Sequence, residues 1–168
     1  GSVVLGLVGG GNNGGDTLYA LADLAHRGVA GHAALLSASV HPEALAAARA
    51  AGVHIAEVQT GDGLDRVKVL ALARRSGVWF DGIAGIGLTG PLREPIASLV
   101  GDLAAEKASS PDPAVVIAVD VPSGVGDDGA VRGPVLPADL TVTMGAAKPG
   151  LLLPPVDSLA GRVQIVEF

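Results

Sequence analysis

Cysteine is absent from this chain of 168 residues. Its absence excludes disulfide bonds, thiolate catalysis and cysteine-bound zinc, and is compatible with a reducing compartment. Aromatic residues are also scarce, at 2%, so the chain lacks the platform of rings on which single-stranded nucleic acid stacks. The hydrophobic core must therefore be built from Ala, Val, Leu and Ile, which fits a sheet covered by helices on both faces.

Positive charge is scarce as well. The chain has 11 Lys and Arg against 17 Asp and Glu, for a formal net charge of -6, and the basic residues are scattered. Such a chain has no electrostatic footprint for nucleic acid or for an anionic membrane. Apolar runs are short, and none approaches the roughly 20 residues that cross a bilayer. We therefore expect no nucleic acid and no membrane among the partners, and a cytoplasmic location.

What the sequence does contain is a regular alternation of two patterns. Short runs rich in Val and Ile alternate with longer segments in which apolar residues recur at i, i+3, i+4 and i+7, as at 18–25 and 96–103. This alternation predicts parallel strands joined by helices, all within one domain over residues 1–168. The polar segment EKASSPDPA (106–114) is expected to be a surface loop. Strands are expected at 3–8, 32–36, 53–58, 78–84, 115–121, 140–144 and 163–168.

The segment GGGNNGGD (9–16) follows the first expected strand and contains only glycine, asparagine and one aspartate. The free N–H groups and partial positive charge at a helix start form an anion site, and glycine lets a phosphate approach the backbone. A simple turn does not require both Asn12 and Asn13, which favours a role for them as ligands. The alternative is a tight turn in which Asp16 caps the following helix.

A nicotinamide-dependent dehydrogenase would use a similar glycine-rich loop. It also needs a carboxylate about 20 residues further on, where it holds the ribose hydroxyl. Here that region reads LLSASVHPE (35–43), with Ser37 and Ser39 but no acid before Glu43. The GxGxxG spacing is also only loosely met. A hydride-transferring enzyme is therefore disfavoured.

Two further expected strands end in glycine-rich turns that carry an aspartate, WFDGIAGIGLTGPL from Trp79 and AVDVPSGVGDDG from Ala118. In a doubly wound sheet of order 3-2-1-4-5, strands 1, 4 and 5 are neighbours, and ligands bind beyond their carboxyl ends. Both turns should then meet the 9–16 segment in one crevice. The side chains expected to share it are those of Asn13, Asp81, Asp120 and Ser123.

The segments GGGNNGGD, DGIAGIGLTGPL, VDVPSG and ADLTVTMGAAKPGL, in this order, closely resemble the YjeF N-terminal-domain family of NAD(P)H-hydrate epimerases over essentially the whole chain. The resemblance implies a Rossmann-like three-layer α/β sandwich with a mostly parallel sheet of core order 3-2-1-4-5. It implies an isomerase of nicotinamide cofactor repair, which interconverts the R and S forms of hydrated NADH and NADPH (NAD(P)HX) at C6 of the nicotinamide ring. One potassium ion (K+) per subunit is implied as cofactor.

Carried over residue by residue, the resemblance implies that Asn13, Asp81 and Ser123 hold the potassium ion. Oxygen ligands of this kind suit a hard cation. Asp120 is implied to face the nicotinamide ring, and we expect it to be the catalytic acid and base, since a carboxylate that ends the apolar run AVVIAVD must be paired, hydrated or functional. The implied substrate-binding residues are Asn12, Asn13, Gly14, Gly15, Asp16, Gly85, Ile86, Gly87, Leu88, Thr89, Gly90, Pro91 and Asp120.

Several of these residues also have a purely structural interpretation. Asp81 ends a strand beside a glycine, where a carboxylate often only satisfies the N–H groups of a turn. Ser123 follows Pro122 in an expected turn and could hydrogen-bond the backbone. Thr89 could cap the helix that follows, and Lys148 is interpreted as a solvated loop lysine rather than a phosphate ligand.

The resemblance also implies partners. An ADP- or ATP-dependent NAD(P)H-hydrate dehydratase acts on the S form, and the chain is expected only to epimerise. A homodimer is implied too, although the two helices that precede the first strand in the family, and help form the dimer, are expected to be lacking here. The alternative from another class is a non-catalytic nucleotide-binding or scaffold module of the same fold. Such a module would tolerate loss of the ion-binding and acid residues, whereas this sequence has all of them.

Overall fold

The computed structural model describes residues 3–85, 87, 89–126, 128–146 and 148–167 of the chain. Its main sheet has seven strands in the order β3-β2-β1-β6-β7-β8-β9, and every neighbouring pair is parallel. The predicted core order 3-2-1-4-5 is confirmed, with β6 and β7 as the fourth and fifth predicted strands, and β8 and β9 extend the sheet beyond them. The strands are β1 (Val4–Val8), β2 (Gly31–Leu35), β3 (His54–Glu57), β6 (Val78–Gly82), β7 (Val115–Val119), β8 (Leu140–Met144) and β9 (Arg162–Val166).

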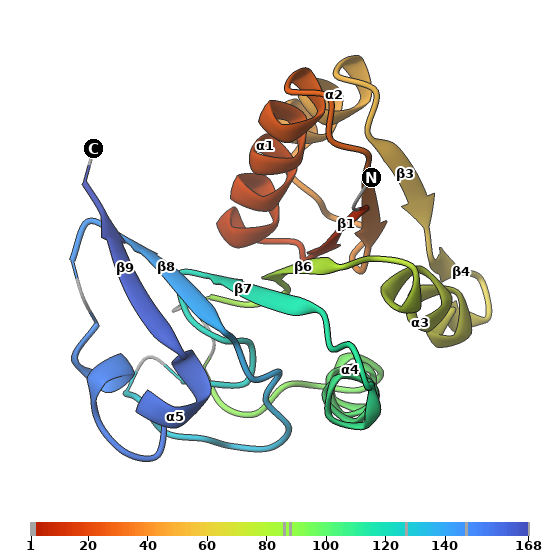
Figure 1. Cartoon of the computed structure of the whole chain (residues 1–168). Coiled ribbons are helices and arrows are strands. Elements are labelled where there is room, and N and C mark those ends of the chain that lie inside the picture. Colours follow the sequence, from red (N-terminus) through yellow and green to blue (C-terminus); the bar gives the residue numbers. More distant parts are fainter. Residues whose placement is uncertain (1–2, 86, 88, 127, 147, 168) are drawn as a thin grey trace.

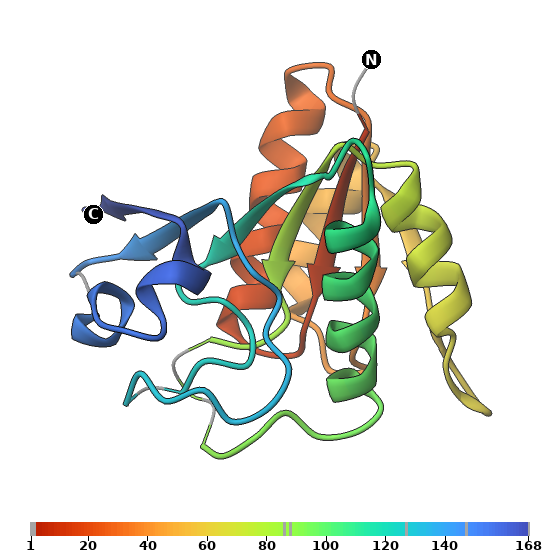
Figure 2. The same ribbon diagram turned by 60° about the horizontal axis from the view of Figure 1, so that its bottom comes forward.

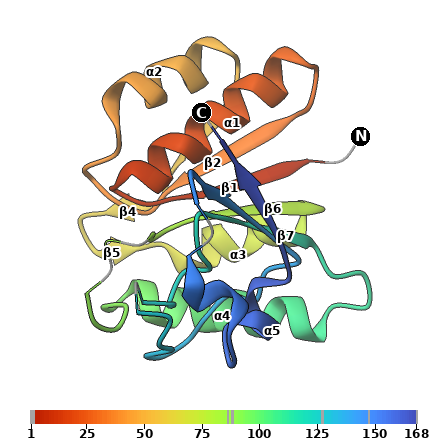
Figure 3. The same cartoon turned by 90° about the vertical axis from the view of Figure 1, so that its left-hand side faces the viewer.

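Helices cover both faces of this sheet (Figures 1 and 3). The helices α1 and α2 pack together on one face, and α3 and α4 pack together on the other. This arrangement confirms the predicted three-layer sandwich. None of the described helices combines the length and apolar character needed to cross a bilayer. The helices are α1 (Asn12–His26), α2 (Pro42–Ala50), α3 (Arg66–Arg74), α4 (Ile96–Ser109) and α5 (Asp157–Ala160), with a 3-10 turn at Pro149–Leu152.

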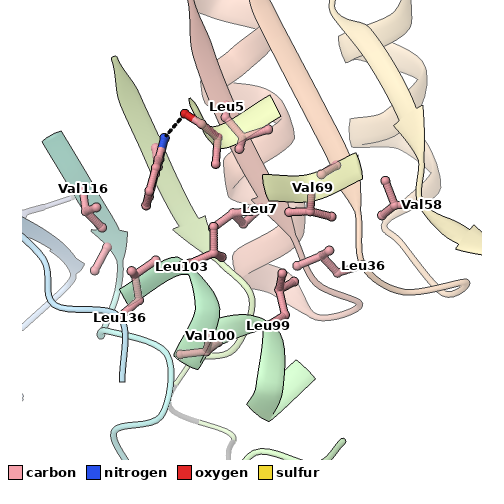
Figure 4. Close-up of a cluster of buried hydrophobic side chains, with 14 of the residues drawn as sticks. Leu5, Leu7, Leu36, Val58, Val69, Leu99, Val100, Leu103, Val116 and Leu136 are labelled. Carbon is pink, nitrogen blue, oxygen red and sulfur yellow. Dashed lines mark hydrogen bonds between the residues drawn. The ribbon is translucent and has the colours of Figure 1, made fainter. Parts of the chain in front are cut away.

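Aliphatic side chains fill the spaces between the sheet and the helices. In the larger cluster, Leu5 and Leu7 of β1 pack with Leu99, Val100 and Leu103 of α4 (Figure 4). Each such buried side chain contributes about 1.5–3 kcal/mol, so a core of this size needs few aromatic rings. The cluster beneath α1 and α2 consists of Val4, Val8, Leu18, Leu21, Ala33, Leu35, Ala44, Ala48 and Val53.

Some element boundaries differ from the sequence prediction. β6 ends at Gly82 and β7 at Val119, earlier than expected, because the chain turns directly after each strand. α4 continues to Ser109, so the start of the 106–114 segment is helical rather than a loop. Ion pairs from Glu106 and Lys107 hold this last turn of the helix. The helix α3 and the small antiparallel hairpin of β4 (Gln59–Thr60) and β5 (Gly63–Leu64) were not predicted.

The helix α1 begins within the glycine-rich segment rather than after it. Its first residue is Asn12, and Gly11 is its N-cap. Asp16 therefore lies in the second turn, and the interpretation of Asp16 as a helix cap is wrong. The Thr17 hydroxyl donates to the Asn13 carbonyl at 2.8 Å, one turn earlier in the helix.

Candidate functional site

The carboxyl ends of β1, β6 and β7 are neighbours in the sheet, and the segments that follow these strands gather at one edge (Figure 2). A cavity of about 370 Å³ lies at this edge. The segment after β1, called the first segment, lines it with Asn12 and Asn13. The segment after β6, the second, lines it with Ala84 and Gly85, and the segment after β7 is the third. Hydrogen bonds from Asn13 to the Val119 carbonyl and from the Ala84 N–H to Ser123 join the end of β7 and the segment after it to the other two, so the three segments meet as predicted. Of the four side chains expected to share one crevice, only that of Asn13 belongs to a described lining residue of the cavity.

Close backbone packing explains two glycines of the first segment. A Cβ atom at Gly9 would lie 1.9 Å from the carbonyl oxygen of Ile83, and one at Gly14 would lie 2.0 Å from the carbonyl oxygen of Gly9. A side chain at Gly9 would push this segment away from the residue that follows β6, and one at Gly14 would push the first turn of α1 away from Gly9. The glycine pattern that indicated a phosphate loop is thus explained at Gly9 by contact with the next segment, and at Gly14 by close packing within its own segment.

Asn13 links all three segments. Its side-chain Nδ2 donates to the carbonyl of Val119, the last residue of β7, at 2.6 Å. The same side chain packs so tightly on Gly85 that a Cβ there would lie 2.5 Å from its amide atoms. With Nδ2 used by Val119, the carbonyl oxygen of the Asn13 amide is the group available for a ligand.

Asp81 is fully buried at 0% exposure, and Ser123 holds it. The Ser123 hydroxyl donates to Oδ1 of Asp81 at 2.5 Å, and the Ser123 N–H donates to Oδ2 at 2.8 Å. The Ser123 oxygen in turn accepts from the Ala84 N–H at 3.0 Å. Burial raises the pKa of Asp81 to about 6, although the hydrogen bonds from Ser123 and Ile83 oppose the rise. The raised pKa reflects a carboxylate taken out of water without a compensating charge.

These residues fit a monovalent hard cation. Within the described part of the chain no Lys, Arg or His forms an ion pair with Asp81. The adjoining segments offer the amide oxygen of Asn13 and the hydroxyl of Ser123, an oxygen donor set that suits potassium or sodium and not zinc or copper. The described residues contain no cluster of three or more His, Asp or Glu that would hold a metal ion by themselves.

Asp120 directly follows β7 and has an unusual backbone. Its φ is 71°, the only positive value among the described residues other than glycine. Its N–H donates to the Val142 carbonyl of β8 at 2.7 Å, which fixes this conformation. A left-handed aspartate of this kind costs free energy and is enriched at functional sites. Its side chain is 9% exposed.

Lys148 contacts Asp120, and the interpretation of Lys148 as a solvated loop lysine is wrong. Its Nζ lies 2.7 Å from Oδ1 of Asp120 and 2.9 Å from the Met144 carbonyl oxygen, and its side chain is 24% exposed. The Thr143 hydroxyl donates to the same Oδ1 at 3.0 Å. Sequence reasoning did not name Thr143, which lies near the end of the strand next to β7, and it weighed Lys148 only as a phosphate ligand or a solvated lysine.

Few of the other predicted substrate-binding residues line the cavity. Burial, reinforced by the negative charge of Asp120 and opposed by His41, raises the pKa of Asp16 above its usual value, so Asp16 and Asp120 are close enough to interact. Gly87 also lines the cavity. The described lining residues do not include Gly14, Gly15, Asp16, Thr89, Gly90, Pro91 and Asp120. Ile86 and Leu88 lie outside the described residues.

Comparisons with known proteins point to one family. A family model described as YjeF-related protein N-terminus matches residues 1–150. An NAD(P)H-hydrate epimerase of Clavibacter michiganensis is 47% identical over 98% of this chain and 71% of its own length. One from Microbacterium testaceum is 44% identical over 98% of this chain and 61% of its own length.

A longer relative and a solved structure extend the comparison. The bifunctional NAD(P)H-hydrate repair enzyme Nnr of Mycobacterium tuberculosis is 37% identical over 98% of this chain, which spans 30% of that protein. The crystal structure of the yeast protein ynu0 superimposes with a TM-score of 0.75 at 22% identity, covering 99% of this chain and 66% of that one. At this identity the likeness shows the fold alone.

Proposed function

The chain belongs to the YjeF-related N-terminal family, and from this membership and its site we propose that it is an NAD(P)H-hydrate epimerase. The enzyme interconverts the R and S forms of NAD(P)HX at C6 of the nicotinamide ring. The observation that carries the assignment to this chain is the edge of the sheet itself, where Asn13, the Asp81–Ser123 pair and a strained, buried Asp120 converge. A fold alone would not distinguish an enzyme from a scaffold, because function depends on the site.

The chemistry needs one group that exchanges a proton and carries negative charge. In NAD(P)HX the hydroxyl on C6 lies next to the ring nitrogen, whose lone pair expels it once an acid has protonated the oxygen. The C6–O bond breaks, water leaves and an iminium-type cation forms. Water then adds to the opposite face of C6 and loses a proton to the same group or to a neighbouring one, so the net reaction is an isomerisation without an oxidant or reductant.

Asp120 is our candidate for this group. Lys148 and Thr143 both contact Oδ1, and among the described residues no donor contacts Oδ2. Oδ2 is therefore the oxygen that is available to give a proton to the C6 hydroxyl and to take one from the returning water. A positioned acid and base of this kind contributes about 10² to 10⁴ in rate, and its negative charge also stabilises the cation.

A potassium ion is the proposed cofactor. The amide oxygen of Asn13, the carboxylate of Asp81 and the hydroxyl of Ser123 would hold it, and when bound it supplies positive charge beside the buried carboxylate. The support is the donor chemistry and the buried Asp81 that has no cationic partner in the described part of the chain. The ion would then order the three segments that follow β1, β6 and β7 around the substrate, and it would not take part in bond making.

The proposed partners follow from the product. The S form is the substrate of an ADP- or ATP-dependent NAD(P)H-hydrate dehydratase, and one relative is named a bifunctional NAD(P)H-hydrate repair enzyme. We propose a dehydratase as functional partner here, with a homodimer as the oligomeric state. Co-incubation with a dehydratase specific for the S form should allow complete consumption of an R and S mixture.

The experiment that tests the function follows stereochemistry directly. Purified protein is added to the separated R form of NADHX or NADPHX, and the approach to the R and S mixture is measured by chromatography. We expect equilibration much faster than the spontaneous rate. Binding of NAD(P)HX without acceleration would instead establish the non-catalytic binding module.

Potassium is tested in the same assay. Replacing it by tetramethylammonium at equal ionic strength should weaken substrate binding or slow epimerisation in the wild type. The Ser123→Ala variant should lose most of this potassium dependence, since it removes one proposed ligand. Equal rates in both salts would remove the ion from the proposal.

A further inference from the structure

Two side chains, Thr143 from β8 and Lys148 from the segment after it, contact Asp120, which follows the neighbouring strand β7. Lys148 donates to Oδ1 of Asp120 and to the Met144 carbonyl, and Thr143 donates to the same Oδ1. Two acceptors thus fix the ammonium group of this lysine, the carbonyl at the end of β8 and the carboxylate of Asp120. A lysine held in this way at 24% exposure is not a flexible surface side chain.

The hydrogen bonds from Lys148 and Thr143 involve only one of the two carboxylate oxygens of Asp120. Both donors bind Oδ1, and in the described chain Oδ2 receives no hydrogen bond. Because the backbone of Asp120 is also fixed, by its N–H bond to Val142 and its φ of 71°, the rotation of the carboxyl group is set almost entirely by Lys148 and Thr143. The two oxygens of Asp120 are therefore not interchangeable.

We propose that Lys148 is a positioning residue for epimerisation: its ammonium holds Oδ1 of Asp120 so that Oδ2 faces the C6 hydroxyl. This role rests on the proposed function. Lys148 does not touch the reacting atoms, and it acts by fixing the one group that does. Misplacement of a catalytic group by about 1 Å can cost about 10²-fold in rate, so removal of the ammonium should lower kcat by that order and change KM little.

The chain offers a matched control in a second lysine–aspartate pair. Lys107 contacts Oδ2 of Asp139 and donates to the Ala114 carbonyl at 3.2 Å, and its side chain is 16% exposed. Asp139 directly precedes β8, so this pair lies at the opposite edge of the sheet from Asp120. The Lys107→Met variant therefore removes a lysine with the same kinds of partner and leaves the proposed site untouched.

The experiment starts with wild-type kinetics of R to S conversion and compares Lys148→Met, Lys148→Arg and Lys107→Met. We expect about a 10²-fold loss of kcat in Lys148→Met with KM within a few-fold, partial recovery in Lys148→Arg, and wild-type kcat in Lys107→Met. Addition of methylammonium to Lys148→Ala should restore rate in a saturable manner, whereas tetramethylammonium, which has no N–H, should not. A merely structural lysine would not respond to the added amine.

A double-mutant cycle completes the test, because positioning requires that Lys148 act through Asp120. In the Asp120→Asn background, Lys148→Met should cause no further loss of kcat. Unchanged kcat in Lys148→Met, or losses that multiply in the double variant, would overturn the positioning role while wild-type epimerisation stands. An inactive wild type would overturn the proposed function itself and this role with it. If Lys148→Met fails to fold, Lys148→Arg and amine rescue of Lys148→Ala decide the question.

Discussion

The two edges of the parallel sheet treat their aspartates differently. At the amino edge, Asp139 accepts from the Val116 N–H at 2.7 Å and from Lys107, and its side chain is 49% exposed. At the carboxyl edge, among the described residues, Asp81 is fully buried with only uncharged partners. Asp120 there has a strained backbone, contacts Lys148 through Oδ1 and has no described donor at Oδ2. The carboxylate at the amino edge thus has its partners within the protein, whereas carboxylate oxygens at the carboxyl edge are available to bind a ligand.

The pKa directions express the same contrast. Burial tends to raise the pKa of Asp139, but the hydrogen bonds from Lys107 and Val116 outweigh it, and the net pKa is lowered. Burial dominates at Asp81 and raises its pKa to about 6. Carboxylates with perturbed pKa values gather at functional sites, and the carboxyl edge is where ligands bind in open α/β sheets.

The largest expected effect is on the rate of epimerisation. Asp120→Asn keeps the shape of the side chain but cannot exchange a proton, so kcat should fall by roughly 10² to 10⁴. Asp139→Asn, at the other edge, should lower the melting temperature and leave the rate per folded molecule unchanged. Both quantities are measured on the same preparations by chromatographic rate assay and thermal melting. Near-normal turnover in a well-folded Asp120→Asn protein would contradict the catalytic role.

The next effect concerns stability and pH. The raised pKa of Asp81 means that its carboxyl binds a proton in the folded chain at pH values where the unfolded chain has released it. Its contribution is therefore fully present below pH 3.8 and is lost as the pH rises through about 6. The rise of the pKa from 3.8 to about 6 corresponds to about 3 kcal/mol in the free energy of unfolding. Each tenfold change in proton affinity contributes about 1.4 kcal/mol.

The measurement is the free energy of unfolding by urea between pH 4 and 7 in potassium-free buffer. Asp81→Asn removes the titrating group, so the difference between wild type and variant isolates its contribution from those of Asp16 and His32, whose pKa values are also shifted. Asp139 contributes with the opposite sign, because its lowered pKa adds stability that is lost as the pH falls. A wild type and an Asp81→Asn protein with parallel pH profiles would show that Asp81 does not titrate as described.

The sequence predicted the sheet better than the site. Aliphatic runs and helical periods are local signals, and the parallel order follows from general rules of chain connection, so the layers, the core order and the meeting of three segments could all be predicted. The start of α1 at Asn12 could not, because glycines disfavour helix locally and are tolerated here for the approach of Gly14 to Gly9.

The contact of Lys148 with Asp120 was missed for a related reason. It depends on β8 lying beside β7 and on the path of the chain after Met144, neither of which is visible in local pattern. Composition indicates only that a loop lysine is usually solvated. The residues that match the family's motifs were found because several segments agree with one another, whereas a single lysine in a loop has no such support.

The smallest expected effect comes from replacing one glycine at each edge of the sheet by alanine. A Cβ at Gly85 would lie 2.5 Å from the Asn13 amide, whereas one at Gly77, just before β6 at the amino edge, would have no atom within 4 Å. Gly85→Ala should displace the end of the flexible Asn13 side chain and break its bond to Val119, at a cost of about 0.5–1.5 kcal/mol in stability. Gly77→Ala should be neutral or stabilise by up to about 1 kcal/mol, since alanine restricts the unfolded chain.

The two variants differ more sharply in function than in stability. Because Asn13 is a proposed ligand of potassium, Gly85→Ala should need a higher potassium concentration for half-maximal epimerisation, while Gly77→Ala should match the wild type. Potassium titrations of the rate and urea unfolding of each variant provide the comparison. A Gly85→Ala protein with wild-type potassium dependence would mean that the position of the Asn13 amide does not matter to the ion, and Asn13 would then be a structural link between α1 and β7 only.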